Sequence, residues 1–219
     1  MEMIFADRVE AGRKLASELE DYSVKDGIVL AIPRGGVVVG YEIAHKLKIP
    51  MDIIIPRKIG APYNPELAIG AMTEDGTIIL DEKLVDYLNV SEAYIKEESE
   101  KQRSEIKRRL KIYRGETPYP NLENRDVIIT DDGIATGSTM KAALASVRRK
   151  GAKLVVIAVP VSPPSTIIDL KNEADRVICL HTPEPFYAIG MFYKDFTQVN
   201  DEEVIRLLRL RREELEAYK

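Results

Sequence analysis

The stretch DVIITDDGIATGST, residues 126–139, decides the fold of this chain. It begins as an apolar, β-branched run typical of a buried strand and reaches two adjacent carboxylates, Asp131 and Asp132. A loop of small, glycine and hydroxyl residues follows, and residues 140–150 have the pattern of a helix. This order predicts a sugar-phosphate site, because backbone N–H groups at a helix N-terminus favour a phosphate.

The residues of this loop suit such a ligand. Gly137 lets the backbone come close to a phosphate, and the hydroxyls of Thr136, Ser138 and Thr139 can donate hydrogen bonds to it. The paired carboxylates can accept hydrogen bonds from ribose hydroxyls and lie near a divalent metal carried by the substrate. The structural alternative is an acidic pair that only caps a helix, but one Asp would suffice for a cap.

A second loop of the same kind lies earlier in the chain. Residues 28–32 have the pattern of a buried strand, and Pro33-Arg34-Gly35-Gly36 leads into a helix at 37–47. Two glycines between strand and helix indicate a backbone that approaches an anion, with Arg34 as the counter-charge. Pro-x-Gly-Gly is also a common tight turn, so this loop alone would be weak evidence.

A third segment with candidate functional residues comes directly after the next expected strand, which spans residues 51–55. Residues 56–66 hold three prolines, a glycine and the adjacent cations Arg57 and Lys58, which predicts a mobile loop. A solvated connection with incidental charge is the alternative.

Strands and helices alternate between residues 28 and 180, with further strands expected at 154–159 and 177–180. This pattern predicts an α/β fold with a doubly wound, mainly parallel sheet, whose ligands bind at the carboxyl ends of the strands. Arg34, Arg57 and residues 131–139 all fall there. We expect one domain over residues 1–219, made of a helix at 7–20, a core at 27–182, an inserted hairpin and long helix within 66–113, a segment at 183–200 and a charged C-terminal helix at 201–218.

Residues 126–139 resemble the phosphoribosyl-pyrophosphate (PRPP) signature of the type I phosphoribosyltransferases. That signature has four apolar residues, two acids, two apolar residues and x-Thr-Gly-x-Thr; Thr130 and Gly133 are departures from it. The resemblance covers roughly residues 27–200. Within 56–71, PRKIG and NPELAIGA resemble a little-characterised bacterial and archaeal group called "predicted phosphoribosyltransferases". The resemblance to the type I phosphoribosyltransferases implies their fold and transfer of the phosphoribosyl group of PRPP to a nitrogenous base, with Mg²⁺-assisted release of pyrophosphate.

The resemblance also assigns roles to residues. The Pro33–Arg34 peptide bond would be cis, and residues 56–66 would be a lid over PRPP, which in several relatives serves the neighbouring subunit, so we expect a homodimer. Asp131 and Asp132 would lie near Mg²⁺ through PRPP and water. The catalytic residues would be Arg34, Arg57, Lys58, Asp131 and Asp132, and the residues binding the 5′-phosphate and pyrophosphate would be Gly35, Gly36, Gly133, Ile134, Ala135, Thr136, Gly137, Ser138 and Thr139.

The acceptor base is less defined. In the family, a small C-terminal "hood", here residues 183–200, holds the base, so Phe186 and Tyr187 would stack on it. They could equally just close the end of the sheet. Ala135 stands where enzymes for 6-oxopurines keep an aspartate and adenine enzymes keep alanine, which makes hypoxanthine or guanine less favoured. Whether the base is a purine or a pyrimidine stays open.

Composition limits the other classes of function. The chain has 219 residues, a net charge of −4 and one cysteine, Cys179. An acidic balance argues against nucleic-acid binding, no apolar run reaches the ~18–20 residues of a membrane span, and residues 1–10 lack the apolar centre of a signal peptide. We therefore expect a cytoplasmic protein that binds neither nucleic acid nor membrane, with Cys179 buried and inert.

Two other interpretations compete with the enzyme. A non-catalytic PRPP sensor could use the same loop, although the acidic charge and the retained Arg34 and Lys58 favour chemistry. A kinase-like nucleotide-binding protein is disfavoured because the chain lacks Gly-x-x-x-x-Gly-Lys-Ser/Thr.

Overall fold

A parallel five-stranded sheet forms the centre of the protein. The computed structural model describes residues 4–20 and 26–217. The strands lie in the order β2-β1-β6-β7-β8, and each neighbouring pair is parallel, which confirms the predicted doubly wound α/β fold. Their bounds are β1 (Ile28–Ala31), β2 (Met51–Ile53), β6 (Asp126–Thr130), β7 (Leu154–Val161) and β8 (Arg176–His181).

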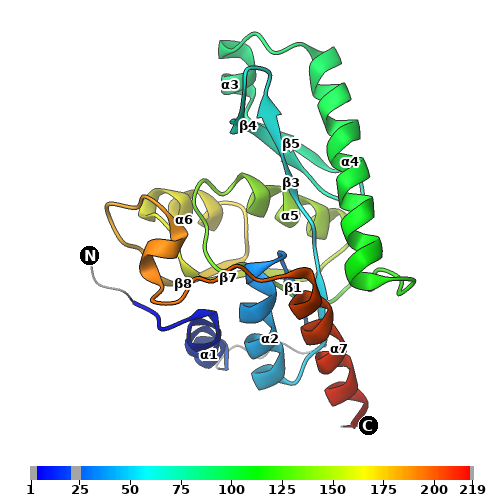
Figure 1. Ribbon diagram of the computed structural model, residues 1–219, viewed down its shortest axis with the longest axis vertical. Coiled ribbons are helices and arrows are strands. Elements are labelled where there is room, and N and C mark those ends of the chain that lie inside the picture. The colour runs from blue at the N-terminus through cyan, green and yellow to red at the C-terminus, as the bar shows by residue number, and fades with distance from the viewer. Residues whose placement is uncertain (1–3, 21–25, 218–219) are drawn as a thin grey trace.

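Helices cover both faces of this sheet (Figure 1). On one face lie α1 (Arg8–Leu19), α2 (Gly35–Leu47) and α7 (Asp201–Ala217), and on the other α5 (Ser138–Arg149) and α6 (Pro164–Lys171). Alternate residues of a strand point to opposite faces. Val29 and Ala31 therefore join the core beneath α1 and α2, whereas Ile28 and Leu30 join the core beneath α5.

A second, antiparallel sheet projects from the body as an arm (Figure 1). Its strands β3 (Arg57–Ala61), β4 (Asn64–Met72) and β5 (Ile78–Leu80) are followed by α3 (Glu82–Tyr87) and the long helix α4 (Glu92–Arg114). The hairpin of β4 and β5 and the long helix match the sequence prediction; α3 is an addition. Ser91 caps α4 by accepting a hydrogen bond from the Tyr94 N–H at 3.3 Å, as its place before the helix suggests.

The prediction that residues 56–66 form a loop without regular structure is wrong. Residues 57–61 form β3, which pairs with β4, and the side chains of Ile59 and Ala61 are buried within the arm. The prolines do not prevent strand pairing here, because Pro65 lies where the pairing is irregular, at register shifts around Gly60. A Cβ on Gly60 would come within 2.6 Å of the Pro65 carbonyl oxygen, so glycine is needed for this close approach.

Smaller differences concern the ends of elements. The helices predicted to begin at residues 37 and 140 begin at Gly35 and Ser138, so residues of both expected ligand loops belong to helix N-termini. Cys179 is only half-buried, contrary to the prediction, although burial raises the pKa of its thiol to about 11, which agrees with an inert thiol. The predicted end of the last helix, Tyr218, lies outside the described residues. Among the described helices, none combines the length and apolarity needed to cross a bilayer.

A polar cluster ties α7 to α2. Arg211 is buried and donates to the Ile49 carbonyl at 3.0 Å and to Glu214 at 2.7 Å, and the Tyr41 hydroxyl donates to Glu214 at 2.7 Å. Desolvation acts to raise the pKa of Glu214, but the hydrogen bonds from Tyr41, His45 and Arg211 outweigh it and lower this pKa to about 2. The ionised carboxylate therefore stabilises the contact between the two helices.

Glu214→Gln is expected to reduce the free energy of unfolding by about 1 kcal/mol at pH 7, a modest value because solvent screens part of the charge. Since the pKa of Glu214 is lower in the folded chain, its contribution is complete above about pH 4.5 and is lost as the pH falls toward 2. Urea unfolding between pH 3 and 7 measures this. Glu213→Gln is the matched control, because Glu213 is exposed and its ion pair with Arg209 is 3.6 Å long. An equal loss for both variants, or one independent of pH, would contradict the assignment.

Candidate functional site

The loops that follow β1 and β6 touch each other at the carboxyl edge of the sheet. A Cβ on Gly36 would lie 2.8 Å from the Cα of Asp131, and a Cβ on Gly35 would overlap the carboxylate of Asp132. The glycines are therefore needed where one loop meets the other, and residues 33–36 and the acidic pair lie together at one place on the sheet edge. The Pro33–Arg34 peptide bond is cis, as the resemblance implied.

The two acids differ in their surroundings. Asp131 lines a cavity, and its Oδ1 accepts a hydrogen bond from the Asp132 N–H at 2.8 Å. Desolvation, followed by repulsion from Asp132, raises the pKa of Asp131 well above its ordinary value. The unliganded site therefore disfavours the ionised form of Asp131, and a cation bound beside it would favour that form.

Asp132 is instead engaged within the protein. Its Oδ2 lies 2.7 Å from Arg8 Nε in an ion pair whose side chains are 10% and 12% exposed. Arg8 also donates to the Thr197 carbonyl at 2.9 Å and lies over the Phe196 ring, 3.8 Å from its centroid. The Tyr193 hydroxyl donates to the Asp132 carbonyl at 2.6 Å. Sequence reasoning missed Arg8 and Tyr193, since 124 and 61 residues separate them from Asp132 and neither stands in a motif.

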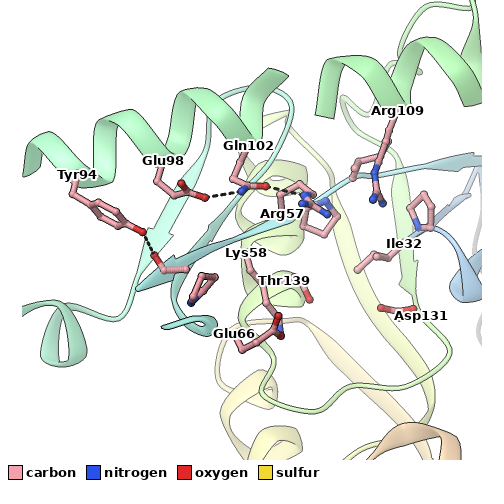
Figure 2. Close-up of a pocket in the computed structure, with 15 residues that line it drawn as sticks. Ile32, Arg57, Lys58, Glu66, Tyr94, Glu98, Gln102, Arg109, Asp131 and Thr139 are labelled. Atoms are coloured by element: carbon pink, nitrogen blue, oxygen red, sulfur yellow. Dashed lines mark hydrogen bonds between the residues drawn. The ribbon is translucent and has the colours of Figure 1, made fainter. Parts of the chain in front are cut away.

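The cavity has a volume of about 530 Å³ and opens between the sheet edge and the arm (Figure 2). Asp131 and Thr139 line it from the stretch of residues 126–139, and Arg57 and Lys58 line it from β3, so these four predicted residues come together. The rest of its lining is Ile32, Pro33, Ile55, Pro56, Gly60, Pro65, Glu66, Tyr94, Glu98, Gln102 and Arg109. The side chains from α4 were not predicted, because a charged helix gives no sign of which face meets a ligand.

Arg34 is absent from this lining. It stands at the N-terminus of α2, and it forms an ion pair with Asp201, 3.5 Å away at the start of α7. The structure thus places Pro33 beside the cavity and directs the Arg34 side chain toward α7.

The loop of residues 133–139 divides into anchored and open parts. Ile134 is buried and its N–H donates to the Val161 carbonyl at 2.9 Å, while the Thr166 hydroxyl donates to the Ala135 carbonyl at 2.8 Å. Gly137 has a φ of +82° and precedes the first turn of α5. The hydroxyls of Thr136 and Ser138, 3.5 Å apart, are accessible at this helix N-terminus. The anchors at Ile134 and Ala135 fix the loop just before the accessible hydroxyls, at a helix N-terminus that favours an anion.

The hood aromatics lie away from the cavity lining. Phe186 packs against Phe192 of the short helix η1 (Ile189–Phe192), with ring centroids 5.0 Å apart, whereas Tyr187 is 75% exposed. Gly133 contacts the hood too, because a Cβ there would approach Ile189 to 2.6 Å. Of the two predicted stacking residues, Phe186 is thus engaged in packing and Tyr187 is accessible.

The acidic residues can be tested for a fit to Mg²⁺. Within residues 4–20 and 26–217, no three His, Cys, Asp or Glu side chains form a metal-binding group. Mg²⁺ usually keeps several waters and binds through one or two carboxylates together with substrate phosphates. Asp131 at the cavity wall fits that mode, with the remaining ligands supplied by a phosphorylated substrate and water.

Comparison with known proteins identifies the family of this chain. The model of the phosphoribosyl transferase domain matches residues 2–193, so the chain belongs to this family. It is 41% identical to TT1426 from Thermus thermophilus, whose crystal structure matches with a TM-score of 0.82 over 94% of this chain and 98% of that one. It is also 42% identical, over 205 residues, to Rv0571c of Mycobacterium tuberculosis strain H37Rv, a protein whose name assigns it provisionally to the phosphoribosyl transferases. That match covers 94% of this chain and 46% of the relative, so the chain spans less than half the length of this curated relative.

Proposed function

We propose that this chain transfers the 5-phosphoribosyl group of PRPP to a nitrogenous base and releases pyrophosphate. The observation that carries the proposal is the cavity in which Asp131, the first turn of α5 and the cations of β3 meet at the carboxyl edge of the sheet. An acid at the cavity wall, a helix N-terminus and cations are the three groups that a ribose bearing a phosphate and a pyrophosphate requires.

The 5′-phosphate would bind at the N-terminus of α5. Thr136, Ser138 and Thr139 offer hydroxyl donors there, and the helix dipole favours the anion. This contact lies away from the reacting carbon, so its binding energy positions the anomeric carbon without being lost in the reaction.

The ribose and the leaving group would occupy the cavity. Asp131 would accept hydrogen bonds from the ribose hydroxyls and lie near the positive charge that develops on the ring as pyrophosphate departs. Arg57 and Lys58 would stabilise the growing negative charge on the pyrophosphate. Mg²⁺, held through Asp131 and substrate oxygens, would supply further charge neutralisation for the leaving group.

The base would enter from the hood side, where Tyr187 is accessible for stacking. A nitrogen of the base would attack the anomeric carbon opposite the departing pyrophosphate, so that one C–O bond breaks and one C–N bond forms with inversion, and the proton on that nitrogen is released to the departing pyrophosphate or to water. Ala135 beside this path carries no group for proton transfer to a 6-oxopurine, which favours other bases.

Isothermal titration of PRPP with Mg²⁺ into the unaltered protein and into Asp131→Asn/Asp132→Asn tests the proposal. We expect the unaltered protein to bind and the double variant to lose affinity by about a hundredfold, because both carboxylates of the acidic pair lose their charge. Asp169→Asn, an exposed change on α6, is the control that should bind normally. Absence of binding to the unaltered protein would contradict the proposal.

Pyrophosphate release with a panel of bases then separates an enzyme from a sensor. An enzyme releases pyrophosphate only with its acceptor base, whereas a PRPP sensor binds PRPP and releases none with any base.

A further inference from the structure

One wall of the cavity is built by α4, and its charge is not used by the chemistry described above. Tyr94, Glu98, Gln102 and Arg109 all line the cavity from this helix (Figure 2). They are spaced by four, four and seven residues, which places them on one face of the helix. This face of α4 therefore lines the same cavity as Arg57.

The polar part of this face fixes the direction of Arg57. The Arg57 Nε donates to Gln102 Oε1 at 2.9 Å, and the Gln102 Nε2 donates to Glu98 Oε1 at 2.7 Å (Figure 2). The Tyr94 hydroxyl donates to the Gly60 carbonyl at 3.0 Å and so joins α4 to β3. The arm thus holds an arginine in place at the cavity wall.

Arg109 brings a second guanidinium into the same cavity. Its Nε donates to Glu105 at 2.8 Å, and its side chain extends from α4 toward the part of the cavity that Ile32 and Asp131 line (Figure 2). Burial, and then the charge of Arg109, lower the pKa of Arg57. Two guanidinium groups that share one cavity repel each other, and an anion between them would remove that repulsion.

We propose that Arg109 binds the pyrophosphate group of PRPP, together with Arg57; this inference rests on the proposed function. Arginine suits the task because its planar guanidinium can give two parallel hydrogen bonds to phosphate oxygens. Arg34, in the loop of residues 33–36, does not line the cavity and forms an ion pair with Asp201. Arg109 of the inserted helix is the cation that reaches the cavity beside Arg57.

The test compares Arg109→Gln with Arg108→Gln. Arg108 is the matched control, because it also bonds Glu105, at 2.7 and 2.9 Å, but is 57% exposed and outside the cavity lining. Each variant removes one positive charge and one partner of Glu105 from neighbouring positions. Two ligands are titrated: pyrophosphate with Mg²⁺, and ribose 5-phosphate, which lacks the pyrophosphate group.

We expect Arg109→Gln to weaken pyrophosphate binding about tenfold or more, as loss of a charge-assisted contact should, and to bind ribose 5-phosphate normally. Arg108→Gln should match the unaltered protein for both ligands, and Arg109→Lys should keep part of the affinity for pyrophosphate. Equal pyrophosphate affinity in Arg109→Gln and Arg108→Gln would overturn the inference and leave the proposed function standing, and so would a parallel loss of both ligands in Arg109→Gln. Failure of the unaltered protein to bind PRPP would overturn the proposed function and this inference with it.

Discussion

Asp131→Asn is expected to lower kcat/KM for PRPP by about 10²–10³, a range typical for removal of one preorganised polar group from an active site. Asp131 is the acid of the pair that lines the cavity, whereas the Asp132 carboxylate is paired with Arg8. Asparagine keeps the shape and can still accept the Asp132 N–H, so the local backbone should be preserved. Steady-state kinetics with varied PRPP measure the effect.

The same substitution is expected to stabilise the protein in the absence of substrate and Mg²⁺. Desolvation and repulsion from Asp132 raise the pKa of Asp131 in the folded chain above its value in the unfolded chain. Such a group opposes folding increasingly as the pH rises above the unfolded value, and the opposition is absent at low pH where both states are protonated. The gain on Asp131→Asn should therefore be present at pH 7 and vanish below about pH 4.

Asp132→Asn is the comparison that separates the two acids. It removes the charge that Arg8 neutralises, so it should destabilise the protein where Asp131→Asn stabilises it. If the two variants have the same effects on stability and on kcat/KM, the different roles assigned to the two acids are wrong.

The site formed by residues 126–139 could be predicted because its functional residues are neighbours in the sequence. A buried strand, an acidic pair and a glycine-rich loop are consecutive in the chain, and parallel strands bring their carboxyl ends to one edge. The order of elements in the core and the meeting of Asp131 with Arg57 followed from such signals, whereas the cis bond at Pro33–Arg34 was implied by the family resemblance.

The parts that sequence reasoning missed depend on contacts between distant segments. Arg109 stands in a helix where charges surround every face, so only the packing of α4 against β3 shows that it meets the cavity. The prediction of a loop at residues 56–66 failed for a related reason, since their composition is that of a loop but Ile59 and Ala61 are buried within the arm. Tertiary burial overrode the local signal there.

Arg8→Met is expected to reduce the free energy of unfolding by about 3–5 kcal/mol, because it leaves the buried Asp132 carboxylate without its partner. Methionine keeps an unbranched apolar side chain against Phe196, so the loss reports mainly the charge. Arg13→Met is the matched control on the same helix: its ion pair with Glu42 is 3.0 Å long but Arg13 is 70% exposed, which predicts a loss of about 0–1 kcal/mol. Urea unfolding at pH 7 measures both.

The double variant Arg8→Met/Asp132→Asn decides whether the ion pair itself is responsible. Removing both charges leaves no unpaired carboxylate, so the double variant should be more stable than Arg8→Met alone, and the cycle should give a coupling energy of about 1–3 kcal/mol. Additive losses would contradict a direct role of the pair. Arg8 joins α1 and the Thr197 carbonyl to the acidic loop, so a strong coupling would mean that the N-terminal helix and the hood hold Asp132 in place and leave Asp131 to face the ligand.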